Sequence, residues 1–227
     1  MHSPTLPRPA RTGAPSAFPA ALWSGVLAGV LLVLVVVEWG PLISFDRAVA
    51  HGLHESAVRQ PGLTHANRVF SDWVWDPWAM RLLIAVIVVR LWRSRERAVA
   101  LWTAAVSALG AGLQQALKAV VGRDRPQWPD PVDSAHFASF PSGHAMTATV
   151  TFGLILWLLA RRDKGPGTRA WLLVVALGAV SVLGVGLTRM YLGVHWASDV
   201  LGGWLLGACL VSVAAVTYER RVVSRRG

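Results

Sequence analysis

Residues 18–37 read FPAALWSGVLAGVLLVLVVV and contain no charged side chain. An α-helix rises about 1.5 Å per residue, so a stretch of this length can cross a hydrocarbon layer of roughly 30 Å. A cleaved signal peptide is the alternative, because Ala48-Val49-Ala50 has the small-x-small form of a cleavage site. That site lies eleven positions beyond Val37, however, and the apolar stretch is longer than the core of a signal peptide. The stretch therefore predicts a first membrane-spanning helix.

Uncharged stretches of 19 or 20 residues recur along the chain. They are residues 98–117, 142–160, 170–188 and 200–218. A further candidate covers about residues 73–92. It is weaker than the others because it includes Asp76, Arg81 and Arg90, and each charge costs up to roughly 3 kcal/mol at the centre of a bilayer. Its tryptophans suit the headgroup region, and Arg90 can reach the membrane surface. The sequence thus predicts an all-α fold, a bundle of six transmembrane helices over residues 18–218.

The composition excludes the main soluble classes of protein. Hydrophobic residues make up 54% of the 227 positions and charged residues only 15%, whereas soluble domains carry about 25% charged residues. A disordered or collagen-like chain would contain far fewer aliphatic residues. Cys209 is the single cysteine, so an intrachain disulfide and a cysteine-based metal cluster are both excluded.

The net charge of +10 is explained by membrane topology. If the N-terminus is cytoplasmic, fourteen of the 22 Lys and Arg residues, but only three of the twelve acidic ones, fall in cytoplasmic segments. These segments are the disordered tail 1–17, the stretches 90–97 and 161–169, and the basic tail 219–227. Short basic loops stay on the cytoplasmic side of a membrane, so no nucleic acid is needed as a partner. Residues 38–72, 118–141 and 189–199 are then expected on the outer side.

Basic residues and histidines collect in these outer segments, near the ends of the apolar stretches. Lys118 ends one stretch, and Arg125 and Pro126 follow beyond Gly122, which permits a turn. This first motif alone is also compatible with interfacial anchors whose charged groups reach the membrane surface.

The second motif is Phe140-Pro-Ser-Gly-His144, which opens an apolar stretch. Ser142 can cap a helix, and the unpaired N–H groups of a first helical turn, with the positive end of the helix dipole, bind anions. Gly143 permits close approach of such an anion, and His144 then lies beside it, at a distance suited to proton transfer. A histidine that is hydrogen-bonded at the membrane interface is the plainer alternative.

The third motif places His195 and Asp199 four residues apart, after Arg189. Residues with this spacing are neighbours on a helix, and a carboxylate bonded to one imidazole nitrogen leaves the lone pair of the other nitrogen free. Such a histidine can act as a base or a nucleophile, although the pair can also be purely structural.

The combination of the three motifs favours phosphoryl transfer. A phosphoryl group can be held by three fixed cations and the start of a helix. Its ester oxygen can then be displaced with the help of one oriented histidine and one further histidine. A metal site would need several carboxylates or a histidine cluster at ligand spacing, and Asp124, Asp130 and Asp133 have no such spacing with a histidine. We therefore expect neither a metal ion nor another cofactor.

With these motifs, the chain resembles the type 2 phosphatidic acid phosphatase (PAP2) superfamily of membrane lipid phosphatases, whose motifs read K-x6-R-P, P-S-G-H and S-R-x5-H-x3-D. The matching positions are Lys118, Arg125 and Pro126; Pro141, Ser142, Gly143 and His144; and Arg189, His195 and Asp199. Thr188 stands where the family usually has Ser and keeps a hydroxyl group. The resemblance implies a PAP2/acid phosphatase-like core of six transmembrane helices in the cell membrane, with its active site on the extracytoplasmic side.

The resemblance also implies the role of each residue in a metal-independent reaction. His195 is the nucleophile that forms a phosphohistidine, Asp199 orients it, and His144 protonates the leaving oxygen and later activates water. The residues implied to bind the substrate phosphate are Lys118, Arg125, Ser142, Gly143 and Arg189. Arg123 and Tyr191 receive no role.

Two other functions and several properties stay open at this stage. A vanadate-dependent haloperoxidase uses similar motifs in a soluble protein and would oxidise halide, whereas a lipid phosphate carrier would release no inorganic phosphate. The lipid substrate can be undecaprenyl diphosphate, phosphatidylglycerophosphate or phosphatidic acid. Gly202, Gly203 and Gly207 permit close helix packing within one bundle or between two chains, so the oligomeric state is open as well.

Overall fold

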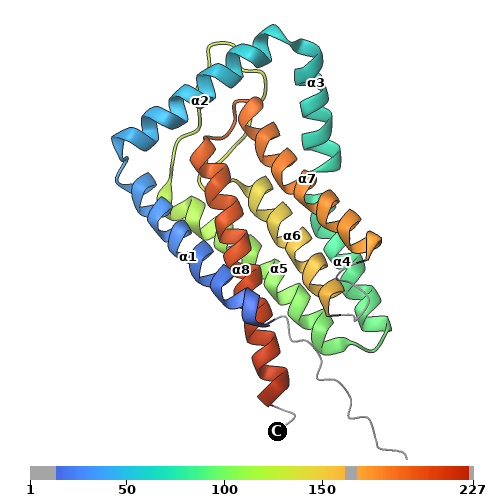
Figure 1. Ribbon diagram of the computed structural model, residues 1–227. Coiled ribbons are helices and arrows are strands. Elements are labelled where there is room, and N and C mark those ends of the chain that lie inside the picture. Colours follow the sequence, from blue (N-terminus) through green and yellow to red (C-terminus); the bar gives the residue numbers. More distant parts are fainter. Residues whose placement is uncertain (1–13, 162–167, 225–227) are drawn as a thin grey trace, which may run out of the picture.

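The computed structural model describes residues 14–161 and 168–224, and this part of the chain is helical throughout, with loops between the helices (Figure 1). The elements in chain order are α1 (Ala14–Val36), α2 (Gly40–Arg59), α3 (Pro61–Val69), the π-helix η1 (Phe70–Val74), α4 (Pro77–Arg93), α5 (Arg97–Val121), α6 (Gly143–Ala160), α7 (Arg169–Tyr191) and α8 (Ala197–Ser224). The predicted all-α fold is confirmed.

Five of these helices are long and apolar enough to cross a membrane, namely α1, α5, α6, α7 and α8. Helix α4 has 17 residues and corresponds to the weakest of the predicted spans. It packs against α5 and α6, so it belongs to the same bundle as the five longer helices (Figure 1).

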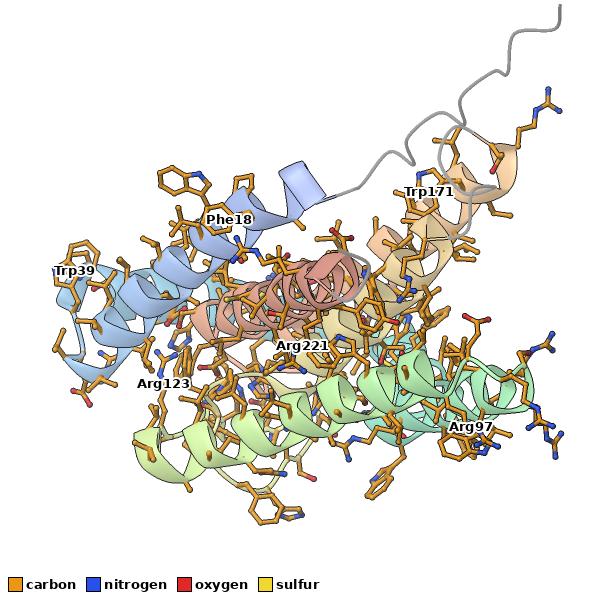
Figure 2. The ribbon with its side chains drawn as sticks, turned by 90° about the horizontal axis from the view of Figure 1, so that it is seen from below. Phe18, Trp39, Arg97, Arg123, Trp171 and Arg221 are labelled. Atoms are coloured by element: carbon orange, nitrogen blue, oxygen red, sulfur yellow. The ribbon has the colours of Figure 1, made fainter. Side chains whose placement is uncertain are left out.

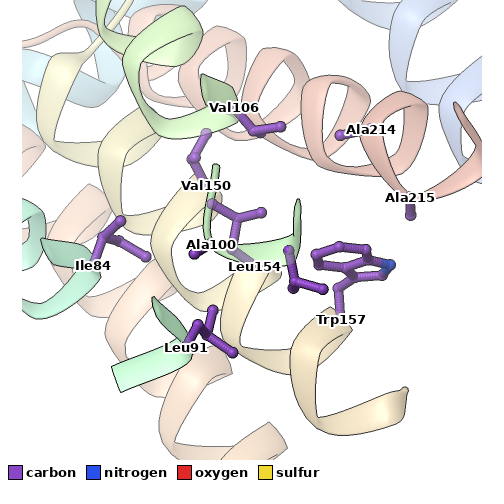
Figure 3. Close-up of a cluster of buried hydrophobic side chains, with 10 residues drawn as sticks. Ile84, Leu91, Ala100, Val106, Val150, Leu154, Trp157, Ala214 and Ala215 are labelled. Carbon is purple, nitrogen blue, oxygen red and sulfur yellow. The ribbon is translucent and has the colours of Figure 1, made fainter. Parts of the chain in front are cut away.

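Helix α6 lies at the centre of the bundle, in contact with α4, α5, α7 and α8. Toward its C-terminal end, an apolar cluster joins four helices (Figure 3). The cluster contains Ile84 and Leu91 of α4, Val99, Ala100 and Val106 of α5, Val150, Leu154 and Trp157 of α6, and Ala214 and Ala215 of α8. Truncating a side chain as deeply buried as Leu154 costs about 2–5 kcal/mol of stability. This cluster therefore fixes the helices at the end of the bundle away from the α5–α6 loop.

The outer faces of the bundle are strongly apolar. Trp23 of α1, Leu101 of α5 and Val180 of α7 all expose at least 60% of their surface, and the Trp39 side chain lies at the outer edge of the bundle (Figure 2). Contiguous apolar surface of this extent is stable only against lipid or another apolar partner. The structure thus agrees with the predicted membrane environment.

Helices α2 and α3 are a feature that the sequence analysis did not predict, since residues 38–72 were expected as an outer loop. Helix α2 runs obliquely across one end of the bundle (Figure 1) and buries Asp46, Ala50, His54 and Ala57 on one face. This spacing of three to four residues marks an amphipathic helix, which is too polar to span a membrane. Helix α2 covers the end of the bundle where the three motifs meet.

Two predicted boundaries can be compared with the helices. Helix α1 begins at Ala14, inside the predicted tail 1–17, and α8 continues to Ser224, inside the predicted tail 219–227. The rest of both predicted tails, at residues 1–13 and 225–227, lies outside the described residues, as do Arg162 and Lys164 of the predicted cytoplasmic loop.

Candidate active site

The first motif is placed by the end of α5. Helix α5 ends at Val121, and Gly122 continues the chain in the left-handed conformation, with φ of 62° and its N–H bonded to the Lys118 carbonyl at 3.1 Å. This conformation is unfavourable for residues with a side chain, so glycine permits the turn that was predicted here. Lys118 stays in the last helical turn, where its ammonium group donates to the carbonyls of Ala138 and Ser139.

The second motif begins α6. Ser142 is the N-cap, and its hydroxyl accepts from the Ala145 N–H at 3.5 Å, as predicted for a capping serine. The Ser142 N–H donates to the Asp199 carbonyl at 2.9 Å, which ties the start of α6 to the start of α8. Gly203 permits this contact, because a Cβ atom there would lie 2.7 Å from the Ser142 carbonyl oxygen.

The third motif joins the end of α7 to the start of α8. His195 Nδ1 lies 3.3 Å from Asp199 Oδ2, which also accepts from the Trp196 N–H at 2.9 Å. Both side chains are fully or almost fully buried. The carboxylate holds the proton on Nδ1, so the lone pair of His195 is on Nε2, which lies 3.3 Å from Arg125 Nη1.

Six of the eight predicted site residues line one cavity of about 290 Å³: Lys118, Arg125, Gly143, His144, Arg189 and His195. The other two, Ser142 and Asp199, lie behind its wall, fully buried, where one caps α6 and the other supports His195. The structure thus brings residues from three distant motifs to a single cavity. Its remaining wall includes Trp78 and Arg81 of α4 and Gln114 of α5, which the sequence analysis did not assign.

The cations around the cavity are held mostly by neutral groups. Arg125 donates to the carbonyls of Phe137 at 2.9 Å, Val194 at 2.5 Å and His136 at 3.1 Å. Arg189 donates to the Ser71 hydroxyl at 2.6 Å, and Asp133 lies at the longer distance of 3.5 Å.

No carboxylate of the described residues forms an ion pair with Lys118 or Arg125. The Nε atom of Arg189 is buried without a partner in the same part of the chain. A cavity with this excess of positive charge and donors is suited to a multiply charged anion such as phosphate.

Burial and the surrounding cations keep His195 neutral. Loss of solvent contributes most, followed by Arg125, Arg189 and Lys118, and together they lower the pKa of the His195 imidazole well below its usual range. A neutral imidazole with a free lone pair is the form in which histidine acts as a nucleophile.

Arg123 and Asp46 form a support that the sequence analysis missed. Arg123 donates to Asp199 Oδ1 at 2.7 Å and to Asp46 Oδ2 at 2.8 Å, and its side chain is only 12% exposed. Asp46, from α2, also accepts from the Ser198 N–H at 2.9 Å and the Ser198 hydroxyl at 2.5 Å. Arg123 thus links α2, the α5–α6 loop and the first turn of α8, directly behind the His195–Asp199 pair.

A second set of contacts holds the α5–α6 loop against α2. The Trp128 ring stacks on His54, with centroids 3.9 Å apart, and the Trp128 indole N–H donates to the Gly193 carbonyl at 2.9 Å. His54 Nε2 lies 3.0 Å from Asp130 Oδ1, and this hydrogen bond lowers the pKa of Asp130. Tyr191, unassigned from the sequence, has its hydroxyl 3.5 Å from that of Ser56 in α2.

Metal binding can be judged from the side chains that the structure describes. Within residues 14–161 and 168–224, no three His, Cys, Asp or Glu side chains lie close enough together to hold a metal ion. The carboxylate of Asp199 is already bonded to Arg123 and Trp196. The metal-free reaction stays a prediction that assay must test.

Comparison with known proteins places the site in a family. The family model described as the PAP2 superfamily matches residues 98–222, which include all three motifs. The chain is 38% identical over 98 residues to phosphatidylglycerophosphatase B of Bacillus subtilis, a match that covers 43% of this chain and 47% of the relative. It is 37% identical over 81 residues to an undecaprenyl-diphosphatase of Sulfolobus acidocaldarius, covering 36% and 34% of the two chains. The matched segments thus span less than half the length of these curated relatives.

The fold resembles that of a solved membrane protein. The crystal structure of a transmembrane PAP2-type phosphatidylglycerolphosphate phosphatase from Bacillus subtilis superposes with a TM-score of 0.77 and 25% sequence identity, covering 88% of this chain and 96% of the other. Together with the five long apolar helices, this likeness identifies the chain as an integral membrane protein.

Proposed function

The chain belongs to the PAP2 superfamily, and from that premise we propose that it is a metal-independent lipid phosphatase that acts through a phosphohistidine. One observation supports this proposal above the others. His195 Nε2, with Nδ1 held by Asp199, faces the same cavity as Lys118, Arg125 and Arg189. A nucleophile beside three cations is the arrangement that phosphoryl transfer requires, because catalysis consists mainly of positioning and charge stabilisation.

In the first step, the lone pair of His195 Nε2 attacks phosphorus. The N–P bond forms as the bond between phosphorus and the leaving oxygen breaks, and His144 gives its proton to that oxygen. Lys118, Arg125 and Arg189, with the Gly143 N–H at the start of α6, stabilise the negative charge on the three other oxygens. Asp199 stabilises the positive charge that the imidazole acquires.

In the second step, water hydrolyses the phosphohistidine. His144, now unprotonated, takes a proton from water as the water oxygen attacks phosphorus, and the N–P bond breaks. His195 leaves with its lone pair restored, and inorganic phosphate is the product. The proton taken up by His144 returns it to the form that begins the next turnover.

The position of the cavity suggests how a lipid reaches it. The cavity is lined by the end of α5, the start of α6 and the loop before α8. These segments lie at the end of the bundle that α2 crosses, whereas α5 begins and α8 ends at the opposite end (Figure 1). Basic segments at that opposite end favour the cytoplasmic side, so we place both termini in the cytoplasm and the cavity on the extracytoplasmic side. A lipid phosphate can then enter from the outer leaflet with its chains still in the bilayer.

The test is release of inorganic phosphate by the purified protein in detergent, with phosphatidylglycerophosphate, phosphatidic acid and undecaprenyl diphosphate as separate substrates. The wild type is expected to release phosphate, and His195→Ala is expected to lose turnover while keeping its thermal stability in detergent. Near-normal hydrolysis by a folded His195→Ala variant would contradict the nucleophile assignment. His136→Ala is the matched control, since His136 also lines the cavity but receives no chemical role.

A further inference from the structure

We propose that Arg81 forms a second anion-binding position in the catalytic cavity, on the leaving-group side, where it binds a second phosphate of the lipid substrate. This inference rests on the proposed phosphatase activity and concerns its substrate class. Arg81 belongs to α4 and to none of the three motifs, yet it lines the same cavity as His144 and His195.

The charge of Arg81 has no acidic partner in the part of the chain that the structure describes. Its guanidinium lies 5.0 Å from the centre of the Trp78 ring, and no ion pair or hydrogen bond joins it to another described residue. Asp76 lines the same wall, but its carboxylate caps α4 by accepting from the N–H groups of Trp78 at 2.6 Å and Ala79 at 3.0 Å. A half-buried arginine without a carboxylate is costly in a membrane protein, and such residues commonly mark binding sites.

Arg81 also lies deeper in the membrane than the catalytic cations. Besides the catalytic cavity, it lines a second, smaller cavity together with Gly110 of α5 and Thr147 of α6. Gly110 precedes Gln114 by one helical turn, and Thr147 follows Gly143 by one turn. Arg81 therefore occupies the part of the wall that a lipid phosphate with its chains in the bilayer would pass.

Gln114 supplies independent evidence for a polar ligand at this position. Its side chain is only 7% exposed, lines the cavity, and has a buried Oε1 atom without a hydrogen-bond partner among the described residues. A buried polar atom left unpaired is destabilising. The amide presents either an acceptor or, after rotation of its terminal torsion, an N–H donor to a bound group.

The chemistry of the reaction places a second phosphate beside these residues. The leaving oxygen departs from the face of phosphorus opposite His195, toward His144 at the start of α6, against which Gln114 packs. In a lipid diphosphate, the bond from the terminal phosphorus to the bridging oxygen breaks, and the leaving group is a lipid monophosphate. In phosphatidylglycerophosphate, the bond to the glycerol oxygen breaks, and the leaving alcohol takes its proton from His144.

Both of these lipids carry a further anionic phosphate beyond the scissile bond, and phosphatidic acid does not. Arg81 stabilises that second phosphate in each case by a charge-assisted hydrogen bond. The substrate class assigned by the structure is thus a lipid with two neighbouring phosphate groups.

The experiment compares kcat/KM for farnesyl diphosphate, phosphatidylglycerophosphate and phosphatidic acid in the purified wild type, Arg81→Gln, Arg81→Lys and the control Arg90→Gln. Arg90 lies in the last turn of the same helix, outside the cavity. Arg81→Gln is expected to lower kcat/KM for at least one two-phosphate lipid by a factor of about 10 to 100 more than for phosphatidic acid. Arg81→Lys should show a smaller differential loss, and Arg90→Gln none. Whether the differential loss falls on the diphosphate or on phosphatidylglycerophosphate identifies the natural source of the second phosphate.

Equal factors for all three lipids, or no change with any of them, would overturn the assignment of Arg81. Absence of phosphate release by the wild type from every lipid would instead overturn the proposed function. If Arg81→Gln does not fold, the second anion-binding position is tested by comparing how strongly farnesyl methylenediphosphonate and farnesyl phosphonate inhibit the wild type. At least tenfold tighter inhibition by the diphosphonate supports this position. Equal inhibition by the two compounds contradicts it.

Discussion

Replacing Arg123 by glutamine should impair catalysis without weakening lipid binding. Arg123 does not line the catalytic cavity, but it donates to Asp199 at 2.7 Å and to Asp46 at 2.8 Å, and both carboxylates are at least 99% buried. The glutamine leaves these two carboxylates without their cation. Asp199 can then shift from the position in which it holds His195 Nδ1.

The expected magnitude follows from these contacts. Breaking a buried ion pair by removing one partner costs about 3–5 kcal/mol of stability. Only the part of this free energy that comes from the hydrogen bond between Asp199 and His195 affects catalysis. A hydrogen bond to a charged group contributes about 1.5–3 kcal/mol. At about 1.4 kcal/mol per factor of ten, kcat should fall by a factor of about 10 to 100, and KM should change less than threefold.

The assay is steady-state phosphate release by the purified variant, together with its thermal unfolding in detergent. Leu154→Ala is the matched control, because it should lose about 2–5 kcal/mol of stability in the apolar cluster and keep the wild-type kcat below its unfolding temperature. Arg123→Lys keeps the charge and should recover part of the lost kcat. A folded Arg123→Gln enzyme with unchanged kcat, or one in which only KM rises, would refute the positioning role.

Three further predictions concern packing, protonation and metal dependence. Gly203→Ala should destabilise the protein by about 1–3 kcal/mol, because the new Cβ meets the Ser142 carbonyl oxygen. In the control Gly112→Ala, the new Cβ meets no atom within 4 Å. The unfolding temperature of this control should be unchanged or slightly raised. The His195 ring should keep the nitrogen NMR shifts of a neutral imidazole from pH 7.5 to pH 5.5, because its pKa is lowered by burial and by the neighbouring cations; a titration midpoint near 6.5 would disagree. The unfolded chain does bind a proton at His195 near pH 6.5, so the contribution of this residue to stability should decrease as the pH falls below that value. Phosphate release should persist in excess EDTA and be inhibited by vanadate, which resembles pentavalent phosphorus, and a strict need for an added divalent ion would contradict the metal-free mechanism.

The residues of the three motifs could be found in the sequence because each motif is a local pattern. The four-residue spacing of His195 and Asp199, the capping position of Ser142 and the turn at Gly122 are all set by neighbours in the chain. The structure adds that Ser142 lies behind the cavity wall, where its hydroxyl caps α6. That position depends on how α8 packs against the start of α6, which no local pattern specifies.

The supporting residues could not be predicted, because their partners are distant in the sequence. Arg123 stands within the first motif, but its role depends on Asp46, 77 positions away in a helix that was expected to be a loop. Helix α2 was missed because it is too polar to be recognised as a membrane span and contains none of the three motifs. Arg81 was noted only as a charge that weakens a predicted span, and its position in the cavity wall emerges from the packing of α4 against α5 and α6.

The most direct test of the account is to trap the covalent intermediate on His195. In His144→Ala, a phosphate ester with a good leaving group, such as p-nitrophenyl phosphate, should still form the intermediate without a proton donor, while hydrolysis by water slows. After an alkaline quench, peptide mass spectrometry should then find phosphate on His195 and none when His195 is replaced by alanine. Phosphate on another residue, or on no residue while turnover continues, would contradict the nucleophile assignment.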